Sequence, residues 1–178
     1  MRLHVPFAVE APGIDEAAEP GETPRVLARR LAQAKAQAVA ARRPEAIVIG
    51  SDQVADLDGE ALSKPGDFES ALHQLERLQG RSVVFHTALA VAAAAGRWMH
   101  IDCVPTTVRF RNLPRASLET YLRVDQPFDC AGAAKIEALG IALTVCVHSD
   151  DPTALVGLPL IAVVNALSAR GINLPGTR

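Results

Sequence analysis

Acidic and basic side chains of the types that phosphate chemistry needs alternate along the first third of the chain. Asp15 and Glu16 lie in a loop rich in Gly and Pro, Lys35 lies in an Ala-rich stretch, and Asp52 and Lys64 follow. Carboxylates supply the oxygen ligands that Mg²⁺ or Mn²⁺ prefers, and lysines can contact phosphate oxygens. The same residues also fit ordinary solvated surface charges, so residue type alone leaves both interpretations open.

Asp52 has a more informative position than the other acids. It follows the apolar run Ala46–Gly50, which has the length and composition of a buried central strand. We therefore expect Ser51, Asp52 and Gln53 at the C-terminal end of this strand. An acid at such a place is either a turn-capping residue or an active-site carboxylate.

The elements that must position these residues form a mixed α/β pattern. Thr23 is a good N-cap and Pro24 suits the first helical position, so we expect a helix from there to Arg43, where Pro44 ends it. Asp58-Gly59 predicts a turn. The other expected elements are a short strand at 7–9, a helix at 67–78, a hairpin of strands at 83–95 and 98–110, a helix at 114–123, a strand near 141–147 and a helix at 159–169.

Composition and charge narrow the class of protein. The 178 residues fit one domain over 1–178, and the net charge of -2 gives no field that would gather nucleic acid or a membrane surface. The longest apolar run, Ala88–Ala95, is far shorter than the ~20 residues of a membrane-spanning helix. Three cysteines without metal or redox spacing, and an N-terminal region with acids and prolines, favour a cytoplasmic location.

Three segments of the sequence resemble the signatures of the Maf family of nucleotide pyrophosphatases. The resemblance runs from about Val5 to Leu167. The central segment is 50–54 (Gly-Ser-Asp-Gln-Val), followed by Leu57-Asp58-Gly59, Leu62 and Lys64-Pro65; the second is Tyr121-Leu122, 128–132, Lys135, Glu137 and 139–141; the third is 150–155 and 157–160.

The resemblance implies a fold and a reaction. The fold would be an elongated, two-lobed α/β structure with a mixed, twisted sheet and a central nucleotide cleft, as in inosine triphosphatase. The reaction would split the α–β phosphoanhydride of a nucleoside triphosphate, with Mg²⁺ or Mn²⁺ bound by Glu16 and Asp52. Asp52 would act as general base, and Lys35 and Lys64 would contact the phosphates. A homodimer is also consistent with the family.

One position and one segment point to a subgroup. Gln53 stands where the pyrimidine-acting subgroup usually has Thr, and the segment around Cys130 and Glu137 resembles the branch that hydrolyses 7-methyl-GTP. Guanine offers its N1 hydrogen and 2-amino group as donors, which a carboxylate accepts. N7 methylation adds positive charge to the base, and the Glu137 carboxylate would attract this charge. The alternative within the family is a pyrophosphatase for dTTP or UTP.

The sequence also departs from the family pattern. Ser63 precedes Lys64 where Gly is usual, and alanines replace more usual residues around Lys135 and Glu137. Members normally open with an apolar strand and a Ser-x-Ser-Pro-x-Arg-like motif that encloses the triphosphate, and we expect this chain to begin after that motif. A second alternative is therefore a nucleotide-binding protein with impaired catalysis.

Other reactive residue types are expected to be ordinary. None of the five histidines has a partner at metal-ligand spacing. Cys130 lies inside a matched segment but has no resolving cysteine nearby, so we expect it to pack as a small residue and not to act as a nucleophile.

Overall fold

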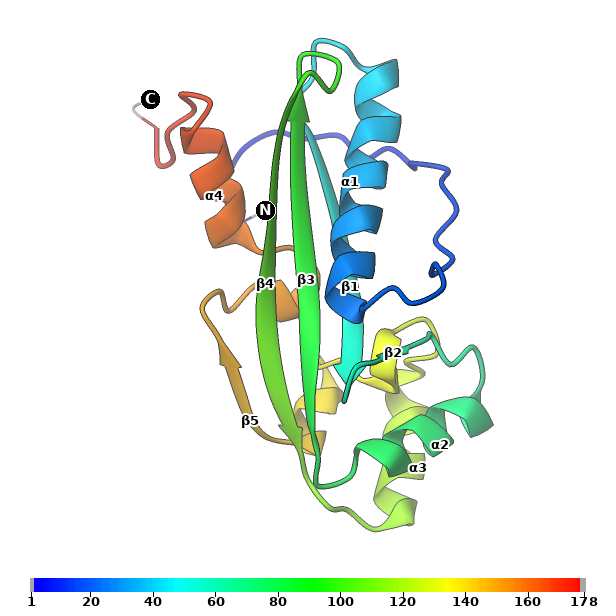
Figure 1. The fold of residues 1–178 in the computed structure, drawn as a ribbon. Coiled ribbons are helices and arrows are strands. Elements are labelled where there is room, and N and C mark those ends of the chain that lie inside the picture. Colours follow the sequence, from blue (N-terminus) through cyan, green and yellow to red (C-terminus); the bar gives the residue numbers. More distant parts are fainter. Residues whose placement is uncertain (1, 177–178) are drawn as a thin grey trace.

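The computed structural model describes residues 2–176, which form one twisted, five-stranded sheet and four α-helices (Figure 1). The strand order is β2-β1-β3-β4-β5, and all four pairings in this part of the chain are antiparallel. The strands are β1 (Val48–Leu57), β2 (Glu60–Leu62), β3 (Ser82–Ala93), β4 (Trp98–Phe110) and β5 (Thr144–Ser149). The helices are α1 (Pro24–Arg42), α2 (Phe68–Leu78), α3 (Arg115–Asp125) and α4 (Leu160–Ser168).

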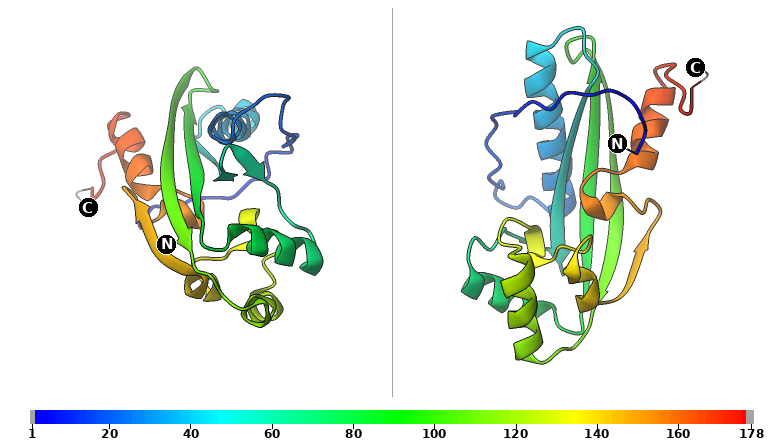
Figure 2. Two further views of the ribbon diagram at one scale, coloured as in Figure 1. Left: turned by 60° about the horizontal axis from the view of Figure 1, so that its bottom comes forward. Right: turned by 180° about the vertical axis from the view of Figure 1, so that it is seen from behind.

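The hairpin of β3 and β4 runs the length of the molecule, with α1 and α4 on opposite faces of the sheet (Figures 1 and 2). Alternate residues of β3 explain this arrangement. Ala88, Ala90 and Ala92 join the core beneath α1, whereas Leu89 and Val91 join the core beneath α4. Small residues on one face let α1 lie close to the sheet, and the larger residues fill the space beneath α4.

Gly50 brings α1 closest to β1. A Cβ at this position would lie 2.5 Å from the carbonyl oxygen of Ala32 and 2.6 Å from the nitrogen of Ala36. Atoms this close are excluded, so the helix backbone can approach only a residue without a side chain. Lys35 lies between these two contacts in the sequence, and the close approach places it against β1.

The opposite end of the sheet carries a second lobe. Helices α2 and α3 pack there around a separate core that includes Leu72, Leu75, Phe85 and Tyr121. Asp67 caps α2 by accepting a hydrogen bond from the Ser70 N–H at 2.8 Å. The elongated, two-lobed α/β arrangement expected from the sequence is therefore confirmed.

Three local expectations are corrected. Residues 7–9 form no strand, and Phe7 and Val9 are largely exposed because the segment runs over the surface without a strand partner in the described chain. The strand expected at 46–50 begins at Val48 and continues to Leu57, so Asp52 lies mid-strand. The strand expected near 141–147 is shifted to β5, because residues 139–143 form a 3₁₀-helix, η2.

The expected mixed sheet is antiparallel throughout the described residues. Helix α2 lies at the end of the sheet and does not cross its face (Figure 1). The chain therefore re-enters the sheet from that end, and β3 runs antiparallel to β1. The short strand β2 also escaped prediction, since it extends only three residues beyond the expected turn at Asp58-Gly59.

Candidate active site

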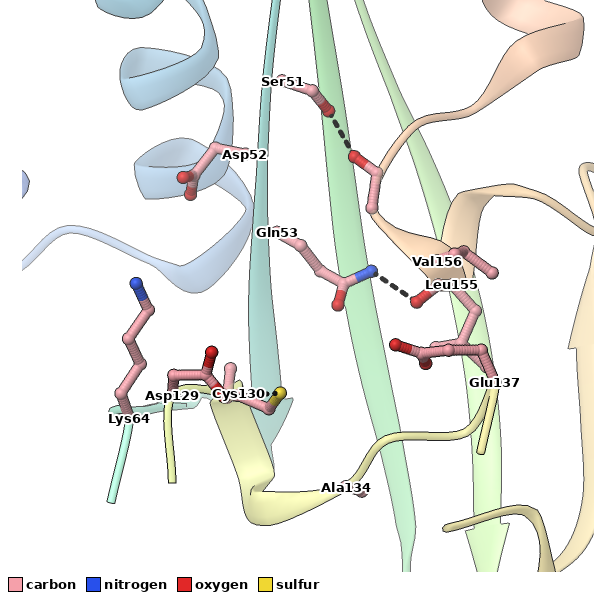
Figure 3. A pocket seen from close by; sticks show the side chains of 12 residues that line it. Ser51, Asp52, Gln53, Lys64, Asp129, Cys130, Ala134, Glu137, Leu155 and Val156 are labelled. Atoms are coloured by element: carbon pink, nitrogen blue, oxygen red, sulfur yellow. Dashed lines mark hydrogen bonds between the residues drawn. The ribbon is translucent and has the colours of Figure 1, made fainter. Parts of the chain in front are cut away.

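A cavity of about 290 Å³ opens between the two lobes beside the middle of β1 (Figure 3). Three walls enclose it: β1, the segment at 129–137 and the segment at 155–157. The lining residues are Ser51, Asp52, Gln53, Lys64, Asp129, Cys130, Ala131, Ala134, Glu137, Leu155, Val156 and Gly157. Four of the six residues predicted for the site thus line one cavity, although they come from segments more than 70 positions apart along the chain or from opposite sides of the turn at Asp58-Gly59.

The other two predicted residues, Glu16 and Lys35, join the site through Asp52. The Lys35 Nζ donates to Asp52 Oδ1 at 2.6 Å and forms an ion pair with Glu16 Oε1 at 2.8 Å. The Asp52 side chain is 11% exposed and that of Glu16 is 45% exposed. The ammonium group of Lys35 therefore bridges a buried carboxylate and a more accessible one.

Burial and charge shift the pKa values of Asp52, Glu16 and Lys35 in opposite directions. Burial raises the pKa of Asp52 above its ordinary value, although the hydrogen bond from Lys35 opposes the rise. The pKa of Glu16 is lowered, chiefly by its hydrogen bond with Lys35. Burial lowers the pKa of Lys35, but the hydrogen bonds to Asp52 and Glu16 outweigh burial and the net pKa is raised. Asp52 is consequently a stronger base than an exposed aspartate, and Lys35 stays cationic.

Lys64 adds a second positive charge at the cavity. It lies after β2, in a loop held to the opposite wall by the hydrogen bond from Gly66 N–H to the Phe128 carbonyl at 2.9 Å. Its charge opposes the rise in the pKa of Asp52 and adds a small contribution to the lowered pKa of Glu16. Two lysines thus act on the same carboxylates from different elements.

Gln53 and Glu137 face the cavity from opposite walls (Figure 3). The Gln53 Nε2 donates to Thr87 Oγ1 at 2.9 Å and to the carbonyl oxygens of Ala154 and Leu155 at 3.1 and 3.2 Å. The amide nitrogen is therefore occupied by the protein, and the carbonyl oxygen is left toward the cavity. Together with the Glu137 carboxylate it offers acceptors to a ligand.

The segment at 149–161 forms a wall whose internal bonding the sequence did not reveal. Asp151 is 2% exposed, and its carboxylate accepts from the Thr153 N–H and hydroxyl and from the Ile161 N–H at the start of α4. Burial raises the pKa of Asp151, but these hydrogen bonds outweigh burial and lower it. The Ser51 hydroxyl joins the same wall to the sheet, since its oxygen lies 2.7 Å from the carbonyl oxygens of both Gly157 and Ala88.

Cys130 is in the cavity wall but is not activated as a nucleophile. Burial, together with the neighbouring Asp129, raises the pKa of its thiol to about 11. The thiol is therefore protonated at neutral pH. All three cysteines are free, and Cys103 is buried.

Within residues 2–176, no group of three or more His, Cys, Asp or Glu side chains is arranged to hold a metal ion. The predicted ligands Glu16 and Asp52 still suit Mg²⁺ or Mn²⁺, because each uses one carboxylate oxygen on Lys35 and keeps the second available. Mg²⁺ commonly takes only one or two carboxylates and completes its shell with water and substrate phosphates. The donor set therefore fits such an ion when a phosphate ligand is also present.

Across residues 2–176, no helix has the length and apolar character needed to span a bilayer.

Comparison with known proteins identifies the family of this chain. The family model described as Maf-like protein matches residues 1–170. A relative from Albidiferax ferrireducens is 52% identical over 98% of this chain and 88% of its own length, and one from Bordetella pertussis is 51% identical over 97% and 85%. A Polaromonas relative is 54% identical over 98% of this chain and 80% of its own length. Each of the three is named 7-methyl-GTP pyrophosphatase. The chain therefore belongs to the Maf family.

Proposed function

We propose that this protein is a nucleotide pyrophosphatase that hydrolyses 7-methyl-GTP to the monophosphate and pyrophosphate. The names of the relatives support this reaction. The observation that carries the proposal is a single cavity with two features. The buried Asp52 carboxylate, which is hydrogen-bonded to Lys35, lines one part of it, and the hydrogen-bond acceptors of Gln53 and Glu137 line another. The first feature suits the phosphates and the second suits a guanine base.

Asp52 is the proposed general base. Its raised pKa makes it a better proton acceptor than an ordinary aspartate, and its place within β1 holds the carboxylate on a rigid element. The Asp52 carboxylate oxygen that is not bound to the metal ion would take the proton from the attacking water. Lys35 and Lys64 would contact the phosphate oxygens and stabilise the charge that develops as the anhydride breaks.

Glu16 and Asp52 are the residues proposed to hold a divalent metal ion. When bound, the ion would neutralise phosphate charge and orient the triphosphate. Phosphate oxygens would compete with both carboxylates for Lys35, because the ammonium group already lies between them. Substrate entry would thus free carboxylate oxygens while it gives Lys35 a new partner.

Gln53 and Glu137 are proposed to read the base. A guanine edge presents two adjacent donors, N1–H and the 2-amino group, and these match the Gln53 carbonyl oxygen and the Glu137 carboxylate. The charged lining residues of the cavity are three carboxylates, at positions 52, 129 and 137, and one lysine. This surplus of negative charge favours the positively charged 7-methylguanine over neutral uracil or thymine.

The reaction is tested by measuring pyrophosphate release from 7-methyl-GTP, GTP, UTP and dTTP with Mg²⁺ or Mn²⁺. We expect the highest kcat/KM for 7-methyl-GTP and a decrease of at least ~100-fold in kcat for Asp52→Asn. Equal rates for a folded Asp52→Asn variant would remove Asp52 from the mechanism. Preference for UTP or dTTP would favour the sister activity, and nucleotide binding without turnover would favour a binding protein.

Base reading is tested with two carboxylates of the same cavity. Glu137→Gln should lower the ratio of kcat/KM for 7-methyl-GTP over UTP, since the amide loses the negative charge and one acceptor. Asp129→Asn is the matched control, because Asp129 lines the cavity but its side chain is 82% exposed. Equal ratios in the wild type and Glu137→Gln would place base recognition elsewhere.

We also propose that the protein acts in the cytoplasm, where three free thiols are stable. A homodimer remains a proposal from the family resemblance. Light scattering at several protein concentrations would measure the oligomeric state directly.

A further inference from the structure

Thr87 fixes the direction in which the Gln53 amide points. The two residues are paired across β1 and β3, and the Thr87 side chain is completely buried. Its hydroxyl donates its single hydrogen to the Ala154 carbonyl at 2.9 Å, so the hydroxyl oxygen can only accept from Gln53. The group of Gln53 that faces Thr87 must therefore be the NH₂.

The main chain imposes the same direction. Carbonyl oxygens of Ala154 and Leu155 lie 3.1 and 3.2 Å from the Gln53 Nε2. A flipped amide would place its own oxygen against these two oxygens, where no hydrogen could lie between them. The two NH₂ hydrogens thus face three acceptors, and the carbonyl oxygen is directed to the cavity.

We propose that Thr87 is a specificity-positioning residue: its hydroxyl orients Gln53 as a hydrogen-bond acceptor, so that the cavity selects bases that donate at this position. The inference rests on the proposed role of Gln53 in base reading. Thr87 does not line the cavity and would not touch the nucleotide. It acts only through the amide of Gln53.

The orientation has a chemical consequence. With the amide fixed, Gln53 cannot rotate to offer its NH₂ to a base that presents an acceptor. Uracil and thymine present carbonyl acceptors on either side of their single N3–H, whereas guanine presents two adjacent donors. A fixed acceptor therefore discriminates between these bases, while a freely rotating amide would accommodate both.

The test compares Thr87→Val, which removes the hydroxyl at nearly constant volume, with Thr87→Ser, which retains it. We expect Thr87→Val to reduce the ratio of kcat/KM for 7-methyl-GTP over UTP by about 3- to 10-fold, the range for one hydrogen bond. The change should arise mainly from a higher KM for 7-methyl-GTP, with kcat for UTP within about twofold because Asp52 is untouched. Thr87→Ser should keep the wild-type ratio to within about twofold.

Two further measurements separate this inference from the proposed function. Gln53→Ala should lower the same ratio, and Thr87→Val in that background should have no additional effect. NMR without nucleotide can measure how fast the Gln53 side-chain amide protons exchange with water. This exchange should be faster in Thr87→Val than in Thr87→Ser. Thr87→Ala serves as a second hydroxyl-free variant if valine lowers the thermal midpoint.

The outcomes are distinct. If Gln53→Ala lowers the ratio and neither hydroxyl-free variant does, Thr87 does not position Gln53 and the inference is overturned while the proposed function stands. Equal losses for 7-methyl-GTP and UTP would show a purely structural role for Thr87. An unchanged ratio in Gln53→Ala would overturn the base-reading role of Gln53, and the inference with it.

Discussion

Gly50 lies so close to Ala32 that an added Cβ would come within 2.5 Å of the Ala32 carbonyl oxygen. Neither atom belongs to a flexible side chain, so one backbone would have to move. The same contact region holds Lys35 against Asp52, since Gly50 and Asp52 lie on the same face of β1 and Lys35 lies one turn of α1 beyond Ala32. The distance between helix and strand therefore sets the geometry of the ion pair.

Gly50→Ala tests this dependence. We expect the displaced helix to lower the free energy of unfolding by about 1–3 kcal/mol, the usual cost of overpacking. We also expect kcat to fall by about 10- to 100-fold, because Lys35 would no longer be aligned with Asp52. Thermal denaturation and pyrophosphate release measure the two effects, and a variant with wild-type values for both would show that α1 has room to move.

The sequence predicted α1 and the β3–β4 hairpin well because their signals are local. Thr23-Pro24 and Pro44 bound the helix, and a single turn separates two long segments with the composition of strands. The sequence predicts Asp52 at a strand end, which is wrong, because polar residues ordinarily interrupt a buried strand. Here Asp52 is satisfied by Lys35 and Gln53 by Thr87, so the strand continues through them.

The positioning residues of the site could not be predicted from the sequence. Thr87 and Gln53 are 34 positions apart and meet only through the register of β1 and β3. The cage around Asp151 likewise depends on the return of the chain to the start of α4. Family resemblance supplied the residues that would touch substrate, but the bonds that hold them appear only in three dimensions.

A second prediction concerns pH. A general base works only when deprotonated, so kcat/KM should fall as pH decreases through the pKa of Asp52, which burial raises above its ordinary value. The hydrogen bond from Lys35 opposes that rise. Lys35→Met should therefore move the acid limb of the pH profile to higher pH, in addition to lowering the rate.

Lys64→Met is the control for this pH shift. Lys64 acts on Asp52 only through its charge, and its influence is smaller than that of the Lys35 hydrogen bond. We expect a shift in the same direction but of smaller size. If Lys35→Met leaves the acid limb in place, a group other than Asp52 controls it.

A third prediction concerns Asp151 and stability. Its lowered pKa contributes stability that is present above the ordinary aspartate pKa and is lost as pH falls through the lower, folded-state pKa. Asp151→Asn removes that charge and one acceptor for the N–H and hydroxyl groups around it. At pH 7 we expect a loss of about 1.5–3 kcal/mol, as for a hydrogen bond to a charged group.

The difference between the wild type and Asp151→Asn should shrink as the pH is lowered below the ordinary aspartate range. Urea denaturation at pH 7 and at progressively lower pH measures it. The neighbouring Asp150→Asn is a suitable control, since only Asp151 accepts from Thr153 and the start of α4. A stability loss that is equal at every pH would rule out the charge as its cause.

The last prediction concerns the segment that carries Glu16. Arg30 of α1 donates through Nε and Nη2 to the Glu22 carboxylate, each at 2.8 Å, and through Nη2 to the Ala17 carbonyl at 2.8 Å. Ala17 directly follows Glu16, whose carboxylate contacts Lys35. One arginine therefore ties this loop to the same helix that provides Lys35.

Arg30→Met should loosen the loop without unfolding the protein. The Arg30–Glu22 ion pair is partly buried, since the Glu22 side chain is 5% exposed and that of Arg30 is 30% exposed, so we expect the thermal midpoint to fall by roughly 2–8 °C while the protein stays folded. Amide exchange and proteolysis at residues 15–22 should become faster, because these residues lose their main anchor to α1. Arg42→Met is the matched control, since Arg42 binds Glu10 and the carbonyls of residues 11 and 12, farther from Glu16.

Direct Mn²⁺ binding, measured by calorimetry with a non-hydrolysable nucleotide, links this loop to the proposed metal ligand. Arg30→Met should weaken Mn²⁺ binding in the wild-type background and have no further effect in Glu16→Gln, because in that variant the carboxylate that the anchor positions is already gone. Arg42→Met should weaken binding less than Arg30→Met. If Arg30→Met loosens the loop but leaves Mn²⁺ binding intact, Glu16 does not hold the metal. If amide exchange at residues 15–22 is unchanged in Arg30→Met, Arg30 does not anchor the loop.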